Sequence, residues 1–341
     1  MSEFYGLLAK LSRLCGTSGD EGDVRDLIMS ILPSGCEARV DPIGNLIVFR
    51  KGKKTPKNKI MYCAHMDEVG FIITSFCSDG RLKFAPVGGI SSAVVFGRRV
   101  VFRNGMTGVI ASKPVHHLSG SEKDNQPKIE DLCIDIGAEN ENEAKKLVSQ
   151  GDFCYFDSRY EEFGSGYIKG KALDDRAGCA VMLTMLEKEP EYDAWFVFTV
   201  QEEIGTRGAG CAAFTVRPDI AVILETTTAC DIPGSEDEKA VCRLGDGAVV
   251  SYMDRSTIYD RELYKLARET AGSIGVKNQT KSVIAGGNDS GAIHKAAGGI
   301  RTIALSVPTR YLHSPACVMK KDDVDAVLKT AEALLPRLAE L

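Results

Sequence analysis

Apolar residues in the first 67 positions are spaced as in helices and strands that alternate along the chain. Residues 2–15 have apolar side chains at positions 4, 7, 8, 11 and 14, which lie on one face of a helix, and residues 21–32 repeat this spacing up to Pro33. Residues 38–50 are typical of extended chain with a turn at 42–45, and residues 59–64 form a short apolar strand.

The same alternation returns from about residue 164 to the carboxyl end. Helical spacing covers residues 177–189, 257–273 and 322–338, and apolar strands cover residues 194–200, 220–224 and 300–307. Strands that are apolar throughout are buried on both faces. The two end segments together therefore predict an α/β fold with a mixed sheet flanked by helices on both faces.

Residues between about 70 and 160 have a different pattern, in which short apolar runs are separated by turn-forming residues. The runs lie at 70–74, 81–84, 99–102 and 107–110. Only residues 140–150 have helical spacing there, and the polar residues 116–128 are expected to form a mobile loop. Short strands at this spacing predict a small β barrel or sandwich. We therefore expect an α/β domain in two pieces, residues 1–67 and 162–341, interrupted by an inserted β-barrel domain at residues 68–161.

Composition narrows the class of protein. Of the 341 residues, 44% are hydrophobic and 26% charged, which excludes a disordered chain. A net charge of −5 argues against nucleic acid as a partner, because phosphate binding needs a basic surface. The sequence shows no signal-peptide core, no long apolar run and no C-x-x-C pair among its 11 cysteines. We expect a cytoplasmic protein with no membrane contact, in which Cys63, Cys179 and Cys211 are reduced core residues.

The predicted strands lead directly into histidines and carboxylates, and Asp174 and Asp175 stand just before a helix. The residues at the strand ends are His65, Asp67, Glu202, Glu203, Glu225 and, a few positions further on, His313. Sites in open α/β sheets form at the carboxyl ends of the strands. Two imidazoles with several carboxylates suit zinc, cobalt or manganese, and four or five ligands exceed the need of one catalytic ion. The pattern therefore predicts two metal ions that share a bridging carboxylate.

Each of these residues also has an ordinary structural explanation. A histidine after a strand is commonly a loop residue, adjacent glutamates are commonly solvated, and Asp174 and Asp175 could cap the following helix. The joint pattern at several strand ends is what favours a metal site. His116, His117 and His294 are expected to be surface or core residues, although the adjacent pair His116 and His117 could also bind metal.

Several stretches of the sequence resemble motifs of one known family. They are AHMDEVGF (64–71), KALDDRAG (171–178), TVQEEIGTRGA (199–209) and YLHSP (311–315), together with PVGGISS (86–92) in the insert. In this order, across essentially the whole chain, they resemble the tetrahedral or glutamyl aminopeptidases, which are cytosolic dinuclear metallopeptidases. The stretch GGNDSGA (286–292) is similar to another motif of this family, but Asn288 could simply cap the following helix and we assign it no chemistry.

The resemblance implies a role for each residue at the strand ends. His65 would bind one ion with its imidazole held by Asp67, and Asp174 would bridge the two ions. Glu203 and His313 would bind the second ion, and Glu202 would be the general base. Glu225 stands where the family usually has aspartate; it can still bind a metal ion, but its extra methylene changes the reach and the metal spacing.

The expected function is that of a metal-dependent aminopeptidase acting on short peptides. Two divalent ions, with zinc expected ahead of cobalt or manganese, would flank a bridging water and lower its pKa, and Glu202 would pass its proton to the leaving amine. The resemblance also implies a homo-dodecameric shell built from dimers. Because the short strands of the insert would leave unpaired edges, we expect the insert to carry the subunit contacts and to contribute no metal ligand.

Three other functions fit parts of the pattern. A related metal-dependent deacylase or carboxypeptidase would use the same ligands. A glycoside hydrolase would pair Glu202 with a second carboxylate and would not need His65 or His313. A non-catalytic assembly protein would result if Glu225 spoils the second metal site. The preferred amino-terminal residue is open: an acidic preference would need a basic group in the pocket, for which Arg207 and Arg310 are candidates.

Overall fold

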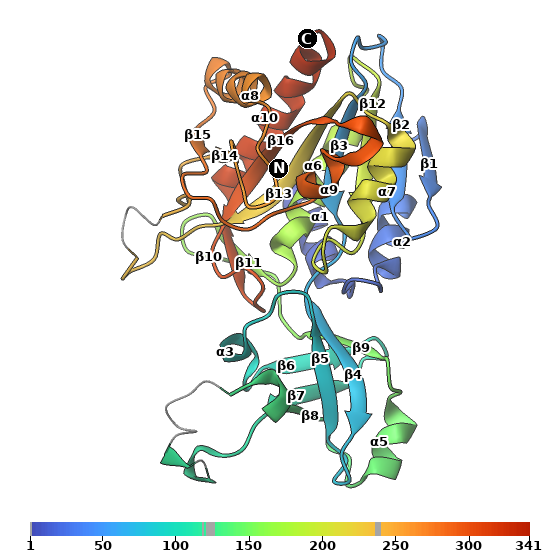
Figure 1. The fold of residues 1–341 in the computed structure, drawn as a ribbon, viewed down its shortest axis with the longest axis vertical. Coiled ribbons are helices and arrows are strands. Elements are labelled where there is room, and N and C mark those ends of the chain that lie inside the picture. The colour runs from blue at the N-terminus through green and yellow to red at the C-terminus, as the bar shows by residue number, and fades with distance from the viewer. Residues whose placement is uncertain (1, 118, 121–126, 236–239) are drawn as a thin grey trace.

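The computed structural model describes residues 2–117, 119–120, 127–235 and 240–341, which form a larger and a smaller lobe joined at a narrow waist (Figure 1). The larger lobe holds a mixed sheet of eight strands. In spatial order they are β1 (Cys36–Val40), β2 (Leu46–Arg50), β12 (Ala194–Thr199), β3 (Ile60–His65), β13 (Ile220–Thr228), β16 (Arg301–Thr309), β14 (Ala248–Val250) and β15 (Asn278–Thr280). A separate three-stranded sheet consists of β10 (Glu161–Phe163), β11 (Tyr167–Gly170) and β17 (Cys317–Lys320).

The centre of the large sheet is parallel and covered on both faces. Strands β12, β3, β13 and β16 run in one direction, and every residue of β3 is buried. On one face α6 (Leu173–Glu187) and α10 (Lys321–Ala339) pack on these strands, with α1 (Ser2–Arg13) and α8 (Arg261–Ser273) against them; α7 (Arg207–Val216) and α9 (Ser290–Ile293) cover the other face. Helix α2 (Gly22–Ile31) lies near β1 and β2. This is the predicted α/β architecture.

The smaller lobe is a closed six-stranded barrel. Around the barrel the strands are β4 (Gly70–Phe76), β5 (Leu82–Val87), β8 (Cys133–Asp135), β7 (Thr107–Ala111), β6 (Arg99–Phe102) and β9 (Phe153–Phe156). Its own hydrophobic core includes Phe71, Phe84 and Phe156. Short helices α3 (Ser92–Val95) and α5 (Glu141–Leu147) and 3-10 turns at Val115–His117 and Ile129–Asp131 flank the strands.

Closure of the barrel corrects one expectation. Strand β9 pairs with β4 on one side and with β6 on the other, so each barrel strand has two neighbours. The unpaired edges that were expected to need a cover are therefore absent from the barrel strands, and the argument for subunit contacts from open edges is wrong. Residues 118 and 121–126 of the expected polar loop lie outside the described residues, so the expectation for that loop stays untested.

Two further local expectations are also wrong. The helix expected to start at residue 257 begins at Arg261, because the side chain of Asp260 accepts the backbone N–H groups of Glu262 and Leu263 and caps it. Cys211 is exposed rather than buried, since the buried face of α7 runs through Ala209, Ala212 and Val216 and helical spacing turns position 211 outward. All eleven cysteines are free.

Contacts across the waist hold the two lobes together. Arg103 of the barrel pairs with Asp20 at 2.7 Å and with Asp23 at 2.8 Å, and the hydroxyl of Tyr155 donates to Asp20. Asp20 lies in the segment that leads into α2 of the large lobe, and Asp23 lies in the first turn of that helix. Among the described residues, no helix is long and apolar enough to span a membrane.

Candidate metal centre

The parallel strands bring the candidate residues to one edge of the sheet, where it faces the barrel (Figure 1). Strand β3 ends at His65, which pairs in register with Thr199 at the end of β12. Glu225 lies in β13 opposite Ser306 of β16, and the chain after β16 returns to the same edge. The residues that the structure gathers here are His65, Asp67, Asp174, Glu202, Glu203, Glu225 and His313.

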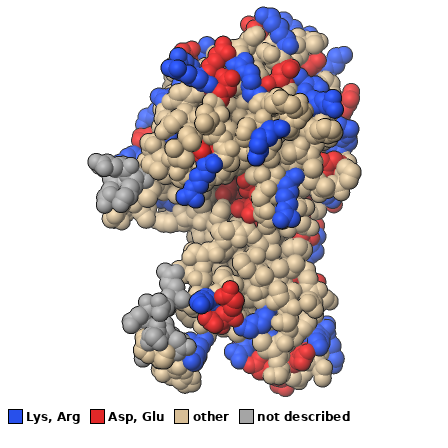
Figure 2. Space-filling view, viewed as in Figure 1, with Lys and Arg blue, Asp and Glu red and all other residues tan. Residues whose placement is uncertain are grey.

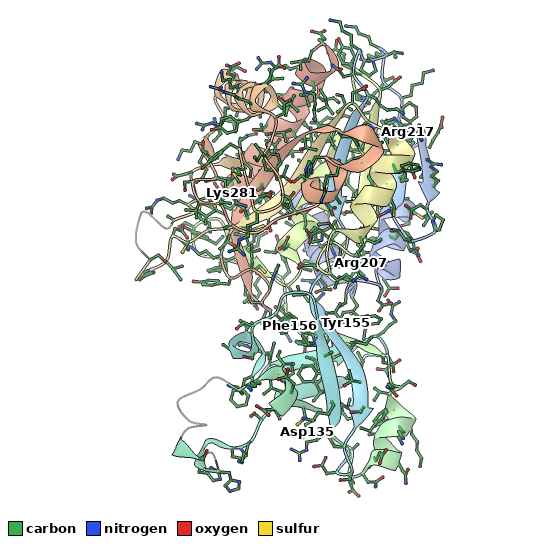
Figure 3. All side chains as sticks on the ribbon, viewed as in Figure 1. Asp135, Tyr155, Phe156, Arg207, Arg217 and Lys281 are labelled. Carbon is green, nitrogen blue, oxygen red and sulfur yellow. The ribbon has the colours of Figure 1, made fainter. Side chains whose placement is uncertain are left out.

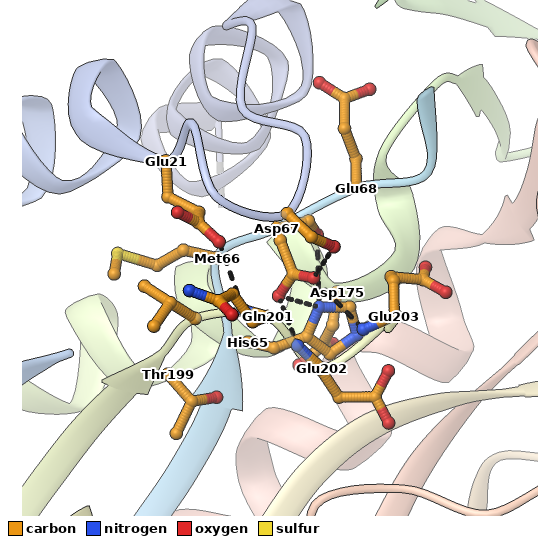
Figure 4. A network of polar contacts seen from close by, with 12 residues as sticks. Glu21, His65, Met66, Asp67, Glu68, Asp175, Thr199, Gln201, Glu202 and Glu203 are labelled. Carbon is orange, nitrogen blue, oxygen red and sulfur yellow. Dashed lines mark hydrogen bonds and ion pairs between the residues drawn. The ribbon is translucent and has the colours of Figure 1, made fainter. Parts of the chain in front are cut away.

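Asp67 ties the first histidine to the two adjacent glutamates (Figure 4). Its Oδ1 accepts the backbone N–H of Glu202 at 3.0 Å, and its Oδ2 accepts the backbone N–H of Glu203 at 3.0 Å and the hydroxyl of Ser18 at 2.6 Å. Oδ1 also lies 3.4 Å from Nδ1 of His65, which is 3.1 Å from the carbonyl oxygen of Asp67. Asp67 therefore orients the turn that carries both glutamates as well as the imidazole.

Two groups of side chains could each hold a metal ion. The first is His65, Asp174 and Glu225, the second is Asp174, Glu203 and His313, and the ligand atoms of each group lie within 4.8 Å of one another. Asp174 belongs to both groups, because its Oδ1 is 3.3 Å from Nε2 of His65 and its Oδ2 is 3.6 Å from Nε2 of His313. A carboxylate with one oxygen toward each histidine has the placement that a bridging ligand needs.

The two glutamate partners complete these groups. An oxygen of Glu203 lies 3.2 Å from Nε2 of His313, and Glu225 lies 3.7 Å from Nε2 of His65. Glu225 also accepts the backbone N–H of Thr226 at 2.8 Å, which fixes its carboxylate at the pocket. The longer side chain at position 225 therefore still reaches the first group.

The second histidine is held from the barrel lobe. Nδ1 of His313 is 2.8 Å from the carbonyl oxygen of Gly89, in the loop after β5. Because a carbonyl only accepts, this contact places a proton on Nδ1, so that Nε2 is the nitrogen that faces Asp174 and Glu203 and could bind a metal ion in place of a proton. Within the described residues the insert adds no side chain to either group, but its backbone orients one of the histidines.

Burial makes the cluster electrostatically unfavourable without a cation. It raises the pKa of Glu203 to about 8, that of Glu225 to about 7, and that of Glu202 well above its usual range. Burial alone would lower the pKa of His313, but hydrogen bonding to Asp174 and the charge of Glu203 raise it to about 9. In the described part of the chain, the buried Oδ1 of Asp174 accepts no hydrogen bond. A divalent cation bound between these imidazole nitrogens and carboxylate oxygens would neutralise the carboxylates and give the Oδ1 atom of Asp174 a partner.

Other candidates from the sequence have different roles. His116 and His117 are exposed on the barrel lobe with their rings edge to face at 4.4 Å, and Nδ1 of His294 lies 2.7 Å from its own helix's Ser290 carbonyl. The capping explanation holds for Asp175 alone, whose carboxylate accepts the N–H of Gly178 at 2.9 Å. The peptide bond between Asp174 and Asp175 is cis.

A pocket of about 150 Å³ opens on the cluster and contains residues to which the sequence analysis assigned no chemistry. Figure 2 shows acidic side chains in a hollow of the large lobe above the waist. Besides the candidate ligands and Glu202, the residues that line the pocket include Thr226, Lys281 and Asn288. Asp289, which is buried beneath the cluster, accepts the hydroxyl of Thr199 at 2.6 Å. Asp289 belongs to the stretch 286–292, whose similarity to a family motif could have pointed to it. Lys281 lies in a polar segment that contains no such motif.

Comparison with known proteins gives matches over nearly the whole chain. The family model described as M42 glutamyl aminopeptidase matches residues 44–330. A relative from Acetivibrio thermocellus is 38% identical over 96% of this chain and 97% of its own. The glutamyl aminopeptidase of Lactococcus lactis is 32% identical over 94% of this chain and 92% of its own. The lysyl aminopeptidase of Pyrococcus furiosus is 31% identical over 98% of this chain and 97% of its own.

Solved structures share the fold, insert included. The TET1 peptidase of Pyrococcus horikoshii superposes with a TM-score of 0.85 at 34% identity, covering 97% of this chain and 98% of that one, and is described as able to assemble into a tetrahedron or a large octahedral shell. A structure from Thermotoga maritima that is described as an endoglucanase superposes with a TM-score of 0.80 at 34% identity. The match covers 97% of this chain and 98% of that one. These matches confirm the resemblance inferred from the sequence motifs. The chain belongs to the M42 glutamyl aminopeptidase family and is a peptide hydrolase of the aminopeptidase type.

Proposed function

We propose that the protein is a metal-dependent aminopeptidase that removes amino-terminal residues from short peptides, with water as the nucleophile and Glu202 as the general base. The observation that carries the proposal is Asp174, whose two oxygens face His65 and His313 in the two groups of potential ligands. We expect zinc, with cobalt or manganese as alternatives, because imidazole and carboxylate donors suit all three. Two divalent ions bound there would supply the Lewis acidity that activates water and polarises the scissile carbonyl.

Glu202 is suited to move the proton. It lines the pocket but belongs to neither group of potential ligands, so its carboxylate stays available. Its backbone N–H is held by Asp67, which fixes the start of the side chain beside the ligands. Burial raises the pKa of Glu202, which makes its carboxylate a stronger base toward water, and the protonated group can then pass the proton to the leaving amine.

The potential metal ligands of the pocket favour a substrate with a free amino terminus. Glu203 and Glu225 are buried carboxylates on the same pocket as Glu202. The free α-amine of a substrate could bind a metal ion held by these carboxylates, whereas the nitrogen of a peptide bond inside a longer chain could not, because it has no basic lone pair. This preference supports removal of terminal residues rather than internal cleavage.

We further propose that residues 1–67 and 162–341 hold the catalytic site and that residues 68–161 make subunit contacts in a cytoplasmic homo-dodecamer built from dimers. The support for self-association is the 34% identical peptidase that is described as assembling into closed shells. Such a shell would admit short peptides and exclude folded proteins. Sedimentation velocity on the purified protein tests this assembly, and a monomer at micromolar concentration would contradict it.

The structure described as an endoglucanase raises glycoside hydrolysis as a second candidate. That reaction needs two carboxyl groups on either side of a sugar ring and no imidazole ligands. Here a carboxylate stands between His65 and His313, which supports a metal site instead. A deacylase or carboxypeptidase with the same ligands would differ only in its substrates. A panel of aminoacyl-anilides, acylated amino acids, carboxyl-blocked peptides and a cellulose oligomer separates these activities.

The direct test compares Glu202→Gln with the same change at Glu189, which is exposed beyond α6. We expect Glu202→Gln to retain both metal ions by elemental analysis and to lose turnover by roughly 10²–10⁴-fold, the range for a lost general base. Glu189→Gln should match the unmodified protein. Near-normal turnover of Glu202→Gln would remove Glu202 from the mechanism, and activity that survives complete removal of metal by a chelator would contradict the whole proposal.

A further inference from the structure

A lysine whose ammonium group makes no hydrogen bond or ion pair with the described residues lines the candidate active-site pocket. Lys281 follows β15, is 7% exposed, and borders the same pocket as Glu202 (Figure 3). Its backbone N–H donates to the carbonyl of Val250 at 3.1 Å. Among the described residues, however, its ammonium group takes part in no hydrogen bond or ion pair. An ammonium removed from water without a partner is unfavourable, so the pocket holds positive charge that an anion would stabilise.

The carboxylates whose charge acts most on Lys281 are Asp254 and Glu225, and both are engaged elsewhere. Asp254 accepts the backbone N–H groups of Ser256 and Thr257 at 2.7 and 2.8 Å, and the hydroxyl of Tyr259 at 2.6 Å. Glu225 faces His65 and accepts the N–H of the next residue. The ammonium of Lys281 is therefore not the built-in partner of either group.

A second unpartnered donor lines the same pocket. Thr226 is 6% exposed, and its hydroxyl has no hydrogen-bond partner within the described residues. Buried polar groups are normally satisfied, and one that is not calls for a bound group to complete it. A cation and a hydroxyl that both lack partners in one pocket fit a ligand with a carboxylate, because its oxygens accept from both.

We propose that Lys281 and Thr226 bind the side-chain carboxylate of the substrate's first residue, so that the enzyme prefers peptides that begin with glutamate or aspartate. This inference rests on the proposed aminopeptidase function, since it places the terminal residue in this pocket. Family membership does not decide the preference, because the similarly related enzymes are a glutamyl and a lysyl aminopeptidase. A lysine-preferring pocket would instead present an unpaired carboxylate away from the metal ligands.

The two arginines considered from the sequence do not supply this charge. Arg310 is held by Asp231 through two hydrogen bonds of 2.7 and 2.8 Å. Arg207 is exposed at the start of α7 and does not line the pocket (Figure 3). Within the described residues, Lys281 is the lysine or arginine that borders the pocket.

The test measures kcat/KM for the p-nitroanilides of glutamate, alanine, leucine and lysine, using the full-length, metal-loaded protein. Lys281→Met keeps the length of the side chain and removes its charge, and Lys329→Met is the matched control on an exposed face of α10. We expect Lys281→Met to lower kcat/KM for the glutamyl substrate by about 10²-fold, as for loss of a buried charge partner, and for the alanyl substrate by less than about threefold. Thr226→Val should lower the glutamyl value by less, and Lys281→Arg should restore most of it.

A binding measurement separates this subsite from a structural role. Free L-glutamate should inhibit hydrolysis of the alanyl substrate by the unmodified protein more strongly than L-glutamine does, and the difference should vanish in Lys281→Met. An equal fall of all four kcat/KM values would overturn the proposal, because Lys281 would then act on the metal site or on the shared part of the substrate. An unmodified protein that prefers leucine or lysine would also overturn it while leaving aminopeptidase function intact. Failure to cleave any of the four would instead contradict the proposed function.

Discussion

Replacing Asp67 with asparagine should weaken the fold and the active site together. The carboxylate of Asp67 has no exposed surface and accepts three hydrogen bonds, from the backbone of Glu202 and Glu203 and from Ser18. An amide of the same shape has one oxygen, so in either orientation at least one of the backbone N–H groups loses its acceptor. A buried N–H group left without an acceptor lowers the free energy of unfolding by about 1–3 kcal/mol. The remaining hydrogen bonds also weaken, because their acceptor is no longer charged, so the expected total loss is about 2–4 kcal/mol.

The same substitution should lower turnover through the residues that Asp67 positions. Asp67 contacts the imidazole of His65 and holds the turn that carries Glu202 and Glu203. Loss of a partner that orients a metal ligand typically reduces metal affinity or activity by about 10–100-fold. Ser18→Ala is the matched control, because it removes one neutral donor and leaves the carboxylate and both backbone bonds; it should cost about 1 kcal/mol and leave turnover nearly unchanged.

Urea unfolding at fixed protein concentration, in excess chelator, measures the stability term without metal binding. Activity is measured separately after adding metal back. Burial raises the pKa of Asp67, but hydrogen bonds from His65 and Ser18 hold it below its usual value. Its contribution is therefore present above the unfolded pKa of about 4 and is lost as the pH falls through the lower folded value. An Asp67→Asn protein that unfolds at the same urea concentration at pH 7 and turns over normally would refute the reasoning.

Three further outcomes are expected. Asp174→Ala should lower the metal content more than His65→Ala or His313→Ala does, because one carboxylate serves both groups; two ions per chain in the Asp174 variant would rule out a bridge. Glu225→Asp shortens a potential ligand that already lies 3.7 Å from His65, so metal titration should show weaker binding or a changed preference, with some activity kept. Asp323 has no exposed surface, and burial raises its pKa to about 6. Between about pH 4 and pH 6 the side chain of Asp323 ionises in the unfolded chain but stays protonated in the fold, so the free energy of unfolding should fall by up to about 3 kcal/mol as the pH rises. Urea titrations should show this loss in the unmodified protein relative to Asp323→Asn.

The sequence predicts the ligand-bearing edge because continuous apolar strands leave little choice about where they end. Strand β3 is buried throughout and parallel to its neighbours, so His65 had to emerge at the same edge as Glu202 and Glu225. The barrel strands were recognisable as short apolar runs. Their closure was not, because Phe71 pairs with Cys154 across a sequence separation that no local pattern records.

Residues that act through the backbone or from short edge strands escaped the sequence. Lys281 follows the three-residue strand β15, which has no apolar alternation to mark it. Gly89 lies in the recognised stretch 86–92, but it acts through its carbonyl oxygen, which any residue type has, so the motif gave it no role. Asp289 lay in a stretch with a recognised similarity, but nothing in the sequence places it beneath the cluster against Thr199.

The contact between Gly89 and His313 couples the position of the insert to the candidate metal centre. A hydrogen bond of 2.8 Å is lost when its atoms move apart by about 1 Å, so the imidazole keeps its orientation only while the barrel keeps its place. The ion pairs of Arg103 with Asp20 and Asp23 join the two lobes and limit such movement. A protein cut free of residues 68–161 would retain every candidate ligand side chain and still lose the part that aims His313. A displacement of the barrel, for example one imposed by crosslinking, would therefore reach the second group of potential ligands through the carbonyl oxygen of Gly89.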